Sequence, residues 1–195
     1  MSPKELKARY RNECLAARDA IPADERIEKG LAMLAHGGDV IDVEPGTVVS
    51  GFLPIRSEVD IRPLMARLRE RGARLCVPVI LDRNTIVFRE LVAGAPLVPV
   101  GFGTFGPGPD AAVFDPDVML VPLSAFDRSG HRIGYGAGHY DRAIERLHQK
   151  GLNPQLIGIA FDCQEVRSVP AEPHDVRLDA ILTESGLNFV SEVIG

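Results

Sequence analysis

Residues 118–141 read VMLVPLSAFDRSGHRIGYGAGHYD and join a run of apolar residues to a loop that contains three glycines. Residues 118–122 are apolar along their whole length, which is typical of a strand that is buried on both faces. A helix is expected from about residue 140 to residue 150, where apolar side chains recur at helical spacing. This stretch therefore predicts a buried strand, a short connection and a glycine loop that opens a helix.

Helical and apolar extended segments alternate on both sides of this stretch. We expect helices at residues 3–20, 23–35 and 61–68, and strands at residues 47–53, 75–80, 85–89, 156–161 and 180–183. Residues 101–109 are rich in Gly and Pro and are expected to form a long loop. Apolar strands that alternate with helices indicate a parallel sheet with helices on both faces. The sequence thus predicts the α/β class, with residues 1–195 forming a single domain of three α/β/α layers around a largely parallel central sheet.

Composition and charge argue against several classes of function. The chain of 195 residues is 45% hydrophobic and 25% charged, as in an ordinary globular domain, and its net charge of −5 argues against nucleic acid as a partner. No apolar run approaches the ~20 residues that span a bilayer, and no signal peptide is expected at the amino terminus. The three cysteines, Cys14, Cys76 and Cys163, are far apart and suggest neither a disulfide framework nor a zinc site. We expect a cytoplasmic protein without a membrane partner.

The loop from Arg132 to Asp141 has the composition of a phosphate-binding loop. Its glycines occupy alternate positions, so its amides can converge without interference from Cβ atoms, and the helix that follows adds partial positive charge. The loop has neither the Lys-Ser/Thr of a Walker loop nor GxGxxG spacing, so a structural turn is the alternative. Asp141 can favour the helix dipole or hold magnesium beside phosphates.

Cations of the first helix form a second candidate group. Lys7, Arg11 and Arg18 stand at positions i, i+4 and i+11 and share one helix face. They could reach a ligand, or they could simply form a solvated face.

Ligands of open α/β sheets bind beyond the carboxyl ends of the strands, which directs attention to the loops after Leu53, Pro122 and Phe161. Glu58, preceded by Ser57, follows the first of these strands and could bind a ligand or merely begin a helix.

The third of these loops contains Gln164 and residues 169–175, VPAEPHD. Its His174-Asp175 pair could act in acid–base chemistry, bind a metal or belong to a structural loop.

In chain order, the motifs are Lys7-x-x-x-Arg11, Glu58 after a Phe-Leu-Pro strand end, the run from Arg132 to Arg142, and residues 164–179. Together they resemble the 5-formyltetrahydrofolate cyclo-ligase family, also called 5,10-methenyltetrahydrofolate synthetase. The resemblance covers nearly the whole chain, and the glycine loop with its Tyr-Asp ending is its specific part.

The resemblance implies a role for individual positions. Those implied to bind ATP are Lys7, Arg11, Arg132, Gly134, Tyr135, Gly136, Ala137, Gly138, His139 and Tyr140. The positions implied to act in catalysis are Lys7, Arg11 and Arg132. Those implied to bind the folate substrate are Leu53, Glu58, Tyr135 and His139. Asp141 and Asp175 are implied to hold Mg²⁺. The chain departs from the common family pattern at Ala137, where glycine or lysine is usual, and at His139, where an aromatic residue is usual.

The implied activity is ATP-dependent cyclisation of 5-formyltetrahydrofolate to 5,10-methenyltetrahydrofolate, with release of ADP and phosphate, by a monomer that acts on small molecules. The formyl oxygen would attack the γ-phosphate, which demands positioning and charge stabilisation rather than a side-chain nucleophile. One alternative is a sugar-phosphate isomerase or CoA-transferase-like enzyme, whose acid–base residue would be Glu58 or His174. Another is a noncatalytic binder of folate or nucleotide.

Overall fold

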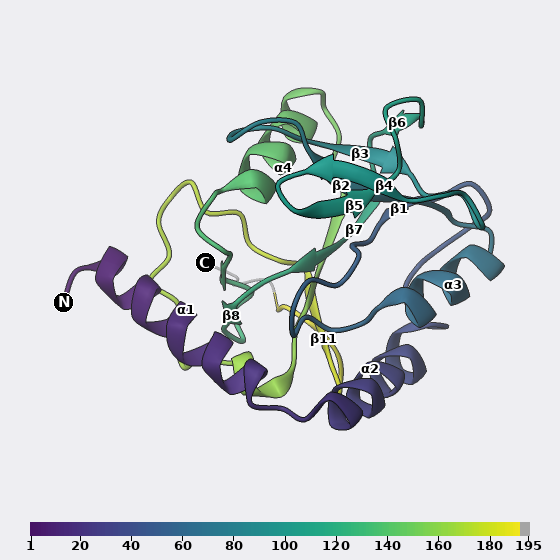
Figure 1. Ribbon diagram of the computed structural model, residues 1–195. Coiled ribbons are helices and arrows are strands. Elements are labelled where there is room, and N and C mark those ends of the chain that lie inside the picture. The colour runs from purple at the N-terminus through teal and green to yellow at the C-terminus, as the bar shows by residue number, and fades with distance from the viewer. Residues whose placement is uncertain (192–195) are drawn as a thin grey trace.

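The computed structural model describes residues 1–191, and its elements are arranged around one large sheet (Figure 1). The helices are α1 (Pro3–Asp19), α2 (Ala23–Gly37), α3 (Arg62–Glu70), α4 (His139–Gln149) and the short 3₁₀ helix η1 (Asp162–Gln164). The strands are β1 (Val48–Ser50), β2 (Arg74–Ile80), β3 (Ile86–Glu90), β4 (Val98–Gly101), β5 (Thr104–Gly106), β6 (Val113–Phe114), β7 (Val118–Pro122), β8 (Ala125–Phe126), β9 (Arg132–Ile133), β10 (Gln155–Ile159), β11 (Ala180–Thr183) and β12 (Gly186–Phe189). Among the helices of this described part, none is long and apolar enough to cross a membrane.

The large sheet has the strand order β12-β11-β10-β7-β1-β2-β3-β6. The neighbours from β11 to β2 pair in parallel, whereas β12, β3 and β6 join the edges in antiparallel orientation. This largely parallel sheet confirms the predicted fold class. Because parallel strands place their carboxyl ends at one edge, the loops that follow β1, β7 and β10 meet at the same end of the sheet.

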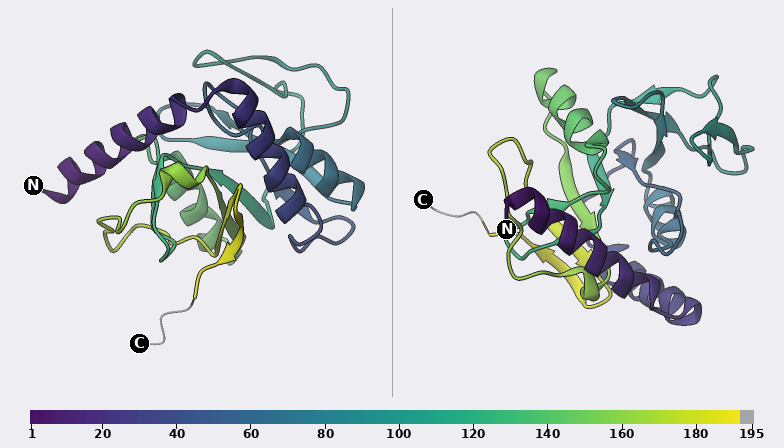
Figure 2. Two further views of the ribbon diagram at one scale, coloured as in Figure 1. Left: turned by 90° about the horizontal axis from the view of Figure 1, so that it is seen from below. Right: turned by 60° about the vertical axis from the view of Figure 1, so that its left-hand side comes forward.

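The two faces of the sheet are buried against different helices. Leu120 and its neighbours on one face form a core cluster with apolar side chains of α2 and α3. Met119 and Val121 point to the other face, where they pack with α4. Helix α1 lies against β8 and η1 instead, across one end of the sheet (Figures 1 and 2).

The start of α1 follows directly from its sequence. Ser2 and Glu5 form a capping box: the Glu5 amide donates to Ser2 Oγ, and the Glu5 carboxylate accepts from the Ser2 amide at 2.6 Å. Pro3 occupies the first turn, where its missing amide hydrogen costs nothing. The helix predicted at residues 3–20 is confirmed.

Several predicted boundaries were wrong. The strand expected at residues 47–53 ends at Ser50. Gly51 follows it and packs so closely on α3 that a Cβ there would stand 2.6 Å from Met65 Sδ. Residues 101–109 are not one long loop, since β4 and β5 form a hairpin there. A second hairpin, β8–β9, separates β7 from the glycine loop, and β12 was missed. Such short strands contain too few residues for a recognisable period.

Leu120→Ala is expected to lower the free energy of unfolding by about 2–5 kcal/mol, because Leu120 is fully buried in the central strand and its truncation leaves a cavity. Leu152→Ala is the matched control, since Leu152 is exposed after α4, and its effect should stay below about 0.5 kcal/mol. Urea unfolding followed by circular dichroism measures both values, and equal effects would contradict the assignment of β7 to the core.

Candidate functional site

The predicted site residues come together at the end of the sheet that α1 crosses. They belong to α1, the segment between β1 and α3, the loop between β9 and α4, and the segment between η1 and β11. The three α1 cations predicted to share one face each contact at least one of these segments, and Arg18 contacts two. The face shared by Lys7, Arg11 and Arg18 is therefore turned toward the site rather than toward solvent.

The glycine loop, residues 134–138, needs two of its glycines for its backbone shape. Gly136 has φ +101° and Gly138 has φ +70°, a left-handed region that side chains disfavour. A Cβ at Gly138 would also lie 2.9 Å from the guanidinium of Arg142. Gly138 is the N-cap of α4, so the loop ends where the amino end of the helix concentrates positive partial charge.

The amides of the glycine loop are available to a ligand. Within residues 1–191, no amide of residues 134–138 donates a hydrogen bond to another group. The first-turn amides of α4 have no partner inside the helix either. A cluster of free amides beside a helix amino terminus is suited to bind phosphate.

The carbonyl groups of the same loop are held by arginines. Arg11 Nε donates to the Gly134 carbonyl oxygen at 2.8 Å. Arg142 Nη2 donates to the Ala137 carbonyl oxygen at 2.6 Å, and its Nε donates to Asn84 in the turn after β2 at 2.8 Å. These contacts leave the amide side of the loop open while its carbonyl side is fixed. The role of Arg142 in holding the loop was not predicted, because nothing in the sequence places residue 84 beside residue 137.

Lys7 is bound to the segment between η1 and β11. Its Nζ lies 2.8 Å from Asp175 Oδ2 and 2.9 Å from Glu172 Oε2. Burial alone would raise the pKa of Asp175, but its hydrogen bond to Lys7 and the Glu172 amide hold that pKa below its ordinary value. Asp175 is therefore an ionised carboxylate at neutral pH, paired with a cation of α1.

Arg132 and Asp141 form a second pair. Arg132 Nη2 lies 2.7 Å from Asp141 Oδ1, and Arg132 Nη1 donates to the Val176 carbonyl at 2.6 Å. The Arg132 side chain is 5% exposed, whereas that of Asp141 is 42% exposed. Arg132 thus orients Asp141 from its buried side, and the Asp141 carboxylate is the group that solvent reaches.

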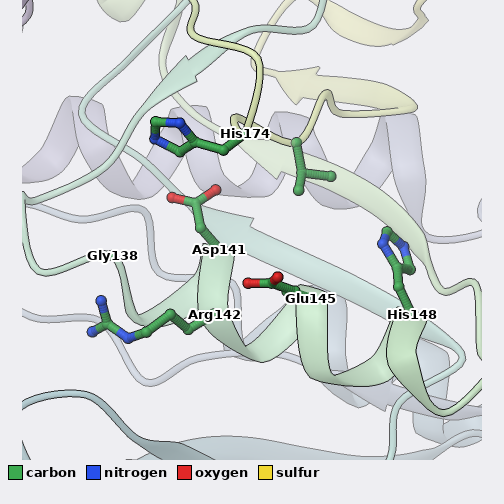
Figure 3. Close-up of a pocket in the computed structure, with 7 residues that line it drawn as sticks. Gly138, Asp141, Arg142, Glu145, His148 and His174 are labelled. Atoms are coloured by element: carbon green, nitrogen blue, oxygen red, sulfur yellow. The ribbon is translucent and has the colours of Figure 1, made fainter.

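A pocket of about 370 Å³ opens beside this pair. Its lining residues are Gly138, Asp141, Arg142, Glu145, His148, His174 and Val176. Figure 3 shows the Asp141 carboxylate beneath the His174 ring, with Glu145 and His148 farther along α4. The pocket therefore joins the end of the glycine loop to the segment that contains Asp175.

The oxygen donors around this pocket could hold a divalent cation. Ligand atoms of Glu172, His174 and Asp175 lie within 4.8 Å of one another, and Asp141 reaches the pocket that His174 also lines. Carboxylate oxygens are the ligands that Mg²⁺ prefers. The donor chemistry of Asp141 and Asp175 fits that ion.

A second group of polar side chains lies between α1 and the segment after β1. Burial raises the pKa of Glu58, whereas its hydrogen bonds to the Ile55 amide and Tyr135 and the charge of Arg18 partly oppose that rise. Leu53, in the same segment, packs partly buried against the core. Buried carboxylates with raised pKa values cluster at functional sites, which supports Glu58 as a ligand-binding residue.

Two side chains at the start of α4 have polar atoms without a partner. Tyr140 Oη and His139 Nε2 are buried and form no hydrogen bond among residues 1–191. Burial also raises the pKa of Tyr140, so its hydroxyl stays protonated. An unpaired buried group is costly unless a ligand or water satisfies it, so both atoms are candidates for ligand contacts.

Comparisons with known proteins relate the sequence and the fold to one family. The model of the 5-formyltetrahydrofolate cyclo-ligase family matches residues 3–184. The 5-formyltetrahydrofolate cyclo-ligase of Mycolicibacterium smegmatis is 34% identical over 200 residues, which cover 94% of this chain and 95% of that protein. The Escherichia coli K12 enzyme of the same name is 33% identical over 174 residues, which cover 86% of this chain and 94% of that protein. The solved structure of Aquifex aeolicus 5,10-methenyltetrahydrofolate synthetase has the same fold, with a TM-score of 0.81, 24% identity, and coverage of 97% of this chain and 95% of that one.

Glu58→Gln is expected to raise the free energy of unfolding at neutral pH, because it removes a charge from a partly buried position. The folded-state pKa of Glu58 lies above its ordinary 4.5, so the folded protein binds more protons than the unfolded chain between pH 4.5 and that higher pKa. The wild-type protein therefore loses stability as pH rises through this window. The gain from the substitution should be complete above the window and absent below pH 4.5.

Urea unfolding at a series of pH values measures this gain. Glu28→Gln is the control, because Glu28 is an exposed carboxylate on α2 and its replacement should have little effect at any pH. A loss of stability in Glu58→Gln that grows with pH would contradict the burial of a charged Glu58.

Proposed function

This chain belongs to the 5-formyltetrahydrofolate cyclo-ligase family, whose activity is the ATP-dependent conversion of 5-formyltetrahydrofolate to 5,10-methenyltetrahydrofolate, and we propose that the residues around the glycine loop carry out that reaction. The observation that carries the proposal is the position of Arg11. Its guanidinium holds the carbonyl side of a glycine loop whose amides have no partner in the described chain, beside the amino end of α4. Phosphate groups are the ligands that such an arrangement binds best.

In this proposal the ATP phosphates lie against the amides of the glycine loop. Arg11 borders the loop, while Lys7 and Arg132 add positive charge from two sides. The residues that we assign to ATP are Lys7, Arg11, Arg132, Gly134, Tyr135, Gly136, Ala137, Gly138, His139 and Tyr140. Ala137 is compatible with this role, because its φ is not positive and its backbone accommodates a side chain.

Asp141 and Asp175 are the proposed Mg²⁺ ligands. Both carboxylates are already oriented by cations, Asp141 by Arg132 and Asp175 by Lys7. Bound there, the ion would neutralise charge on the transferred phosphoryl group. Arg132 and Lys7 would then hold the carboxylates in place, as groups around a metal site commonly do.

The folate ring system is assigned to the other side of the glycine loop. Glu58 supplies an acceptor for ring N–H groups, and Tyr135 borders the same space, because each shifts the pKa of the other. Leu53 adds apolar surface, and His139 can stack on a flat ring. Both substrates would therefore meet at one loop.

The reaction requires alignment more than side-chain nucleophilicity. The formyl oxygen attacks the γ-phosphorus, the bond from that phosphorus to the bridging oxygen of ADP breaks, and a phosphorylated iminium carbon results. Nitrogen 10 attacks this carbon and loses its proton, and phosphate leaves with the former formyl oxygen. Lys7, Arg11, Arg132 and the loop amides would hold the phosphoryl group in line and spread its negative charge.

We further propose that one copy of the chain, acting as one domain, is sufficient. The assigned residues come from α1, the segment after β1, the glycine loop and the segment before β11 of the same chain. We also propose that the protein acts in the cytoplasm, whose reducing conditions keep thiols such as those of Cys14, Cys76 and Cys163 free.

Purified protein supplied with ATP, Mg²⁺ and 5-formyltetrahydrofolate is expected to form 5,10-methenyltetrahydrofolate, which absorbs in the near ultraviolet. Reactions that lack ATP or contain EDTA should form no product. Tight folate binding without turnover would instead indicate a noncatalytic binder, and turnover without nucleotide would indicate a different enzyme class.

Lys7→Ala and Asp141→Asn are each expected to weaken binding of Mg-ATP by about 10-fold or more, because each removes a charge assigned to the nucleotide or its metal. Lys150→Ala and Asp115→Asn are matched controls, since Lys150 and Asp115 form an exposed pair at 3.0 Å with the same charges. Isothermal titration calorimetry with a nonhydrolysable ATP analogue and Mg²⁺ measures the affinities. Unchanged affinity in both site variants would contradict the phosphate-site assignment.

A further inference from the structure

Of the three α1 cations that face the site, Lys7, Arg11 and Arg18, only Arg18 has no role in the phosphate-binding or metal-binding assignment. Arg18 is only 4% exposed, although arginine is rarely buried unless it is paired. A buried guanidinium is expensive to desolvate, so its retention requires specific partners. The contacts of Arg18 identify those partners.

Arg18 joins the segment after β1 to the glycine loop. Its Nε donates to Ser57 Oγ at 2.9 Å, and its Nη1 donates to Tyr135 Oη at 2.7 Å. Ser57 Oγ in turn donates to Asp19, the neighbour of Arg18 on α1. Ser57 is thereby fixed between a cation and an anion, and the direction of Arg18 is fixed with it.

Tyr135 needs such an anchor. It stands between Gly134 and Gly136 in the loop and is 46% exposed, so its backbone and ring would otherwise have considerable freedom. The Arg18 guanidinium carbon also lies 5.8 Å from the centre of the Tyr135 ring, within the range of a cation–π contact. Arg18 therefore restrains both the hydroxyl and the ring of Tyr135.

The charge of Arg18 also acts on Glu58. The groups that face this carboxylate are Arg18 from α1, Tyr135 from the glycine loop and Tyr140 from α4, together with the Ile55 amide of its own segment. Of these groups Arg18 alone is positively charged. Its charge favours the ionised form of Glu58, in addition to the larger effects of the hydrogen bonds from the Ile55 amide and Tyr135.

We propose that Arg18 is a positioning residue for the folate substrate, which holds Tyr135 through its hydroxyl and places a positive charge beside Glu58. The inference rests on the proposed function, since Glu58 and the Tyr135 side chain are assigned there to the folate, whereas the ATP role of Tyr135 is that of its backbone amide. It adds the requirement that Arg18 hold Tyr135 and Glu58 in place for the folate, which the ATP and magnesium assignments do not contain. Arg18 acts through its neighbours and contacts neither the phosphates nor the metal ligands.

The test compares Arg18→Gln, Arg18→Lys and the control Arg9→Gln in the full-length protein. Arg9 lies on the same helix but is exposed. It pairs with Glu13 across one helical turn at 3.3 Å and lies over the Tyr10 ring, and it contacts none of the site segments in the described chain. Arg18→Gln should raise KM for 5-formyltetrahydrofolate by about 10-fold or more and change KM for ATP by less than about 2-fold. Arg18→Lys should recover part of the folate affinity, because it keeps the charge but not both hydrogen bonds.

The pH dependence separates positioning from a general loss of structure. Removal of the Arg18 charge raises the pKa of Glu58 further, so the acid limb of kcat/KM for the folate should move to higher pH in Arg18→Gln. Arg18→Lys should leave the limb close to its wild-type position, and Arg9→Gln should not move it. A variant that is merely less well folded would lose activity equally at all pH values within its stability range.

A double-mutant cycle tests the route through Tyr135. If Arg18 acts through the Tyr135 hydroxyl, Arg18→Gln should raise the folate KM less in a Tyr135→Phe background than in the wild-type background. Circular dichroism verifies that each variant is folded. If Arg18→Gln does not fold, Arg18→Lys and its cycle with Tyr135→Phe decide the question.

Wild-type protein that forms no methenyl product would refute the proposed function. Active wild-type protein whose Arg18 variants match Arg9→Gln in folate KM and pH profile would refute the role of Arg18 alone. A KM increase for ATP equal to that for the folate would refute it as well.

Discussion

Docking of α1 across the carboxyl end of the parallel strands is the interaction on which the candidate site depends. Cys14 of this helix is buried with Ala125, Ile133 and Val169 in a small core cluster that is separate from the two larger ones. That cluster fixes α1 against the hairpin that leads into the glycine loop. Without this apolar contact, the cations of α1 would lie on a solvated helix and would have no ligand to share with the loop.

The charges of the site are arranged in neighbouring pairs of opposite sign. Lys7 with Asp175, and Arg132 with Asp141, hold carboxylates near a loop that favours anions. Unpaired cations or carboxylates in partly buried positions would destabilise the fold, so each pair stabilises the site in the absence of substrates. In our proposal Mg-ATP adds both a cation for the carboxylates and an anion for the arginines and lysine, which keeps the balance of charge.

The glycine loop combines left-handed glycines with firm anchors. Gly136 and Gly138 adopt left-handed conformations, while Arg11 holds the Gly134 carbonyl before them and Arg142 holds the Ala137 carbonyl between them. Preorganisation of this kind lowers the entropic cost of binding, because the loop does not have to order around its ligand. The Tyr135 side chain extends from the loop and is half exposed, so it has an anchor of its own in Arg18.

Sequence alone determined the features that arise from local preferences and short-range periods. The capping box at Ser2 and Glu5 specifies the start of α1, and the apolar run at residues 118–122 specifies a buried strand, because both depend on residues a few positions apart. The left-handed turns of the glycine loop likewise arise from residues a few positions apart. The strand β12 and those of the β4–β5 hairpin were not predicted, because they are short and contain Gly or Pro, residues that sequence patterns assign to turns and loops.

Only the tertiary structure decided which charges meet. Lys7 pairs with residues more than 160 positions away, and Arg18 reaches both Ser57 and Tyr135, whose separation in sequence gives no hint of contact. Helical spacing could place Lys7, Arg11 and Arg18 on one face, but it could not distinguish a solvated face from a buried one. That distinction came from the packing of α1 against β8 and η1, since burial and long-range pairing depend on how distant segments are arranged in space.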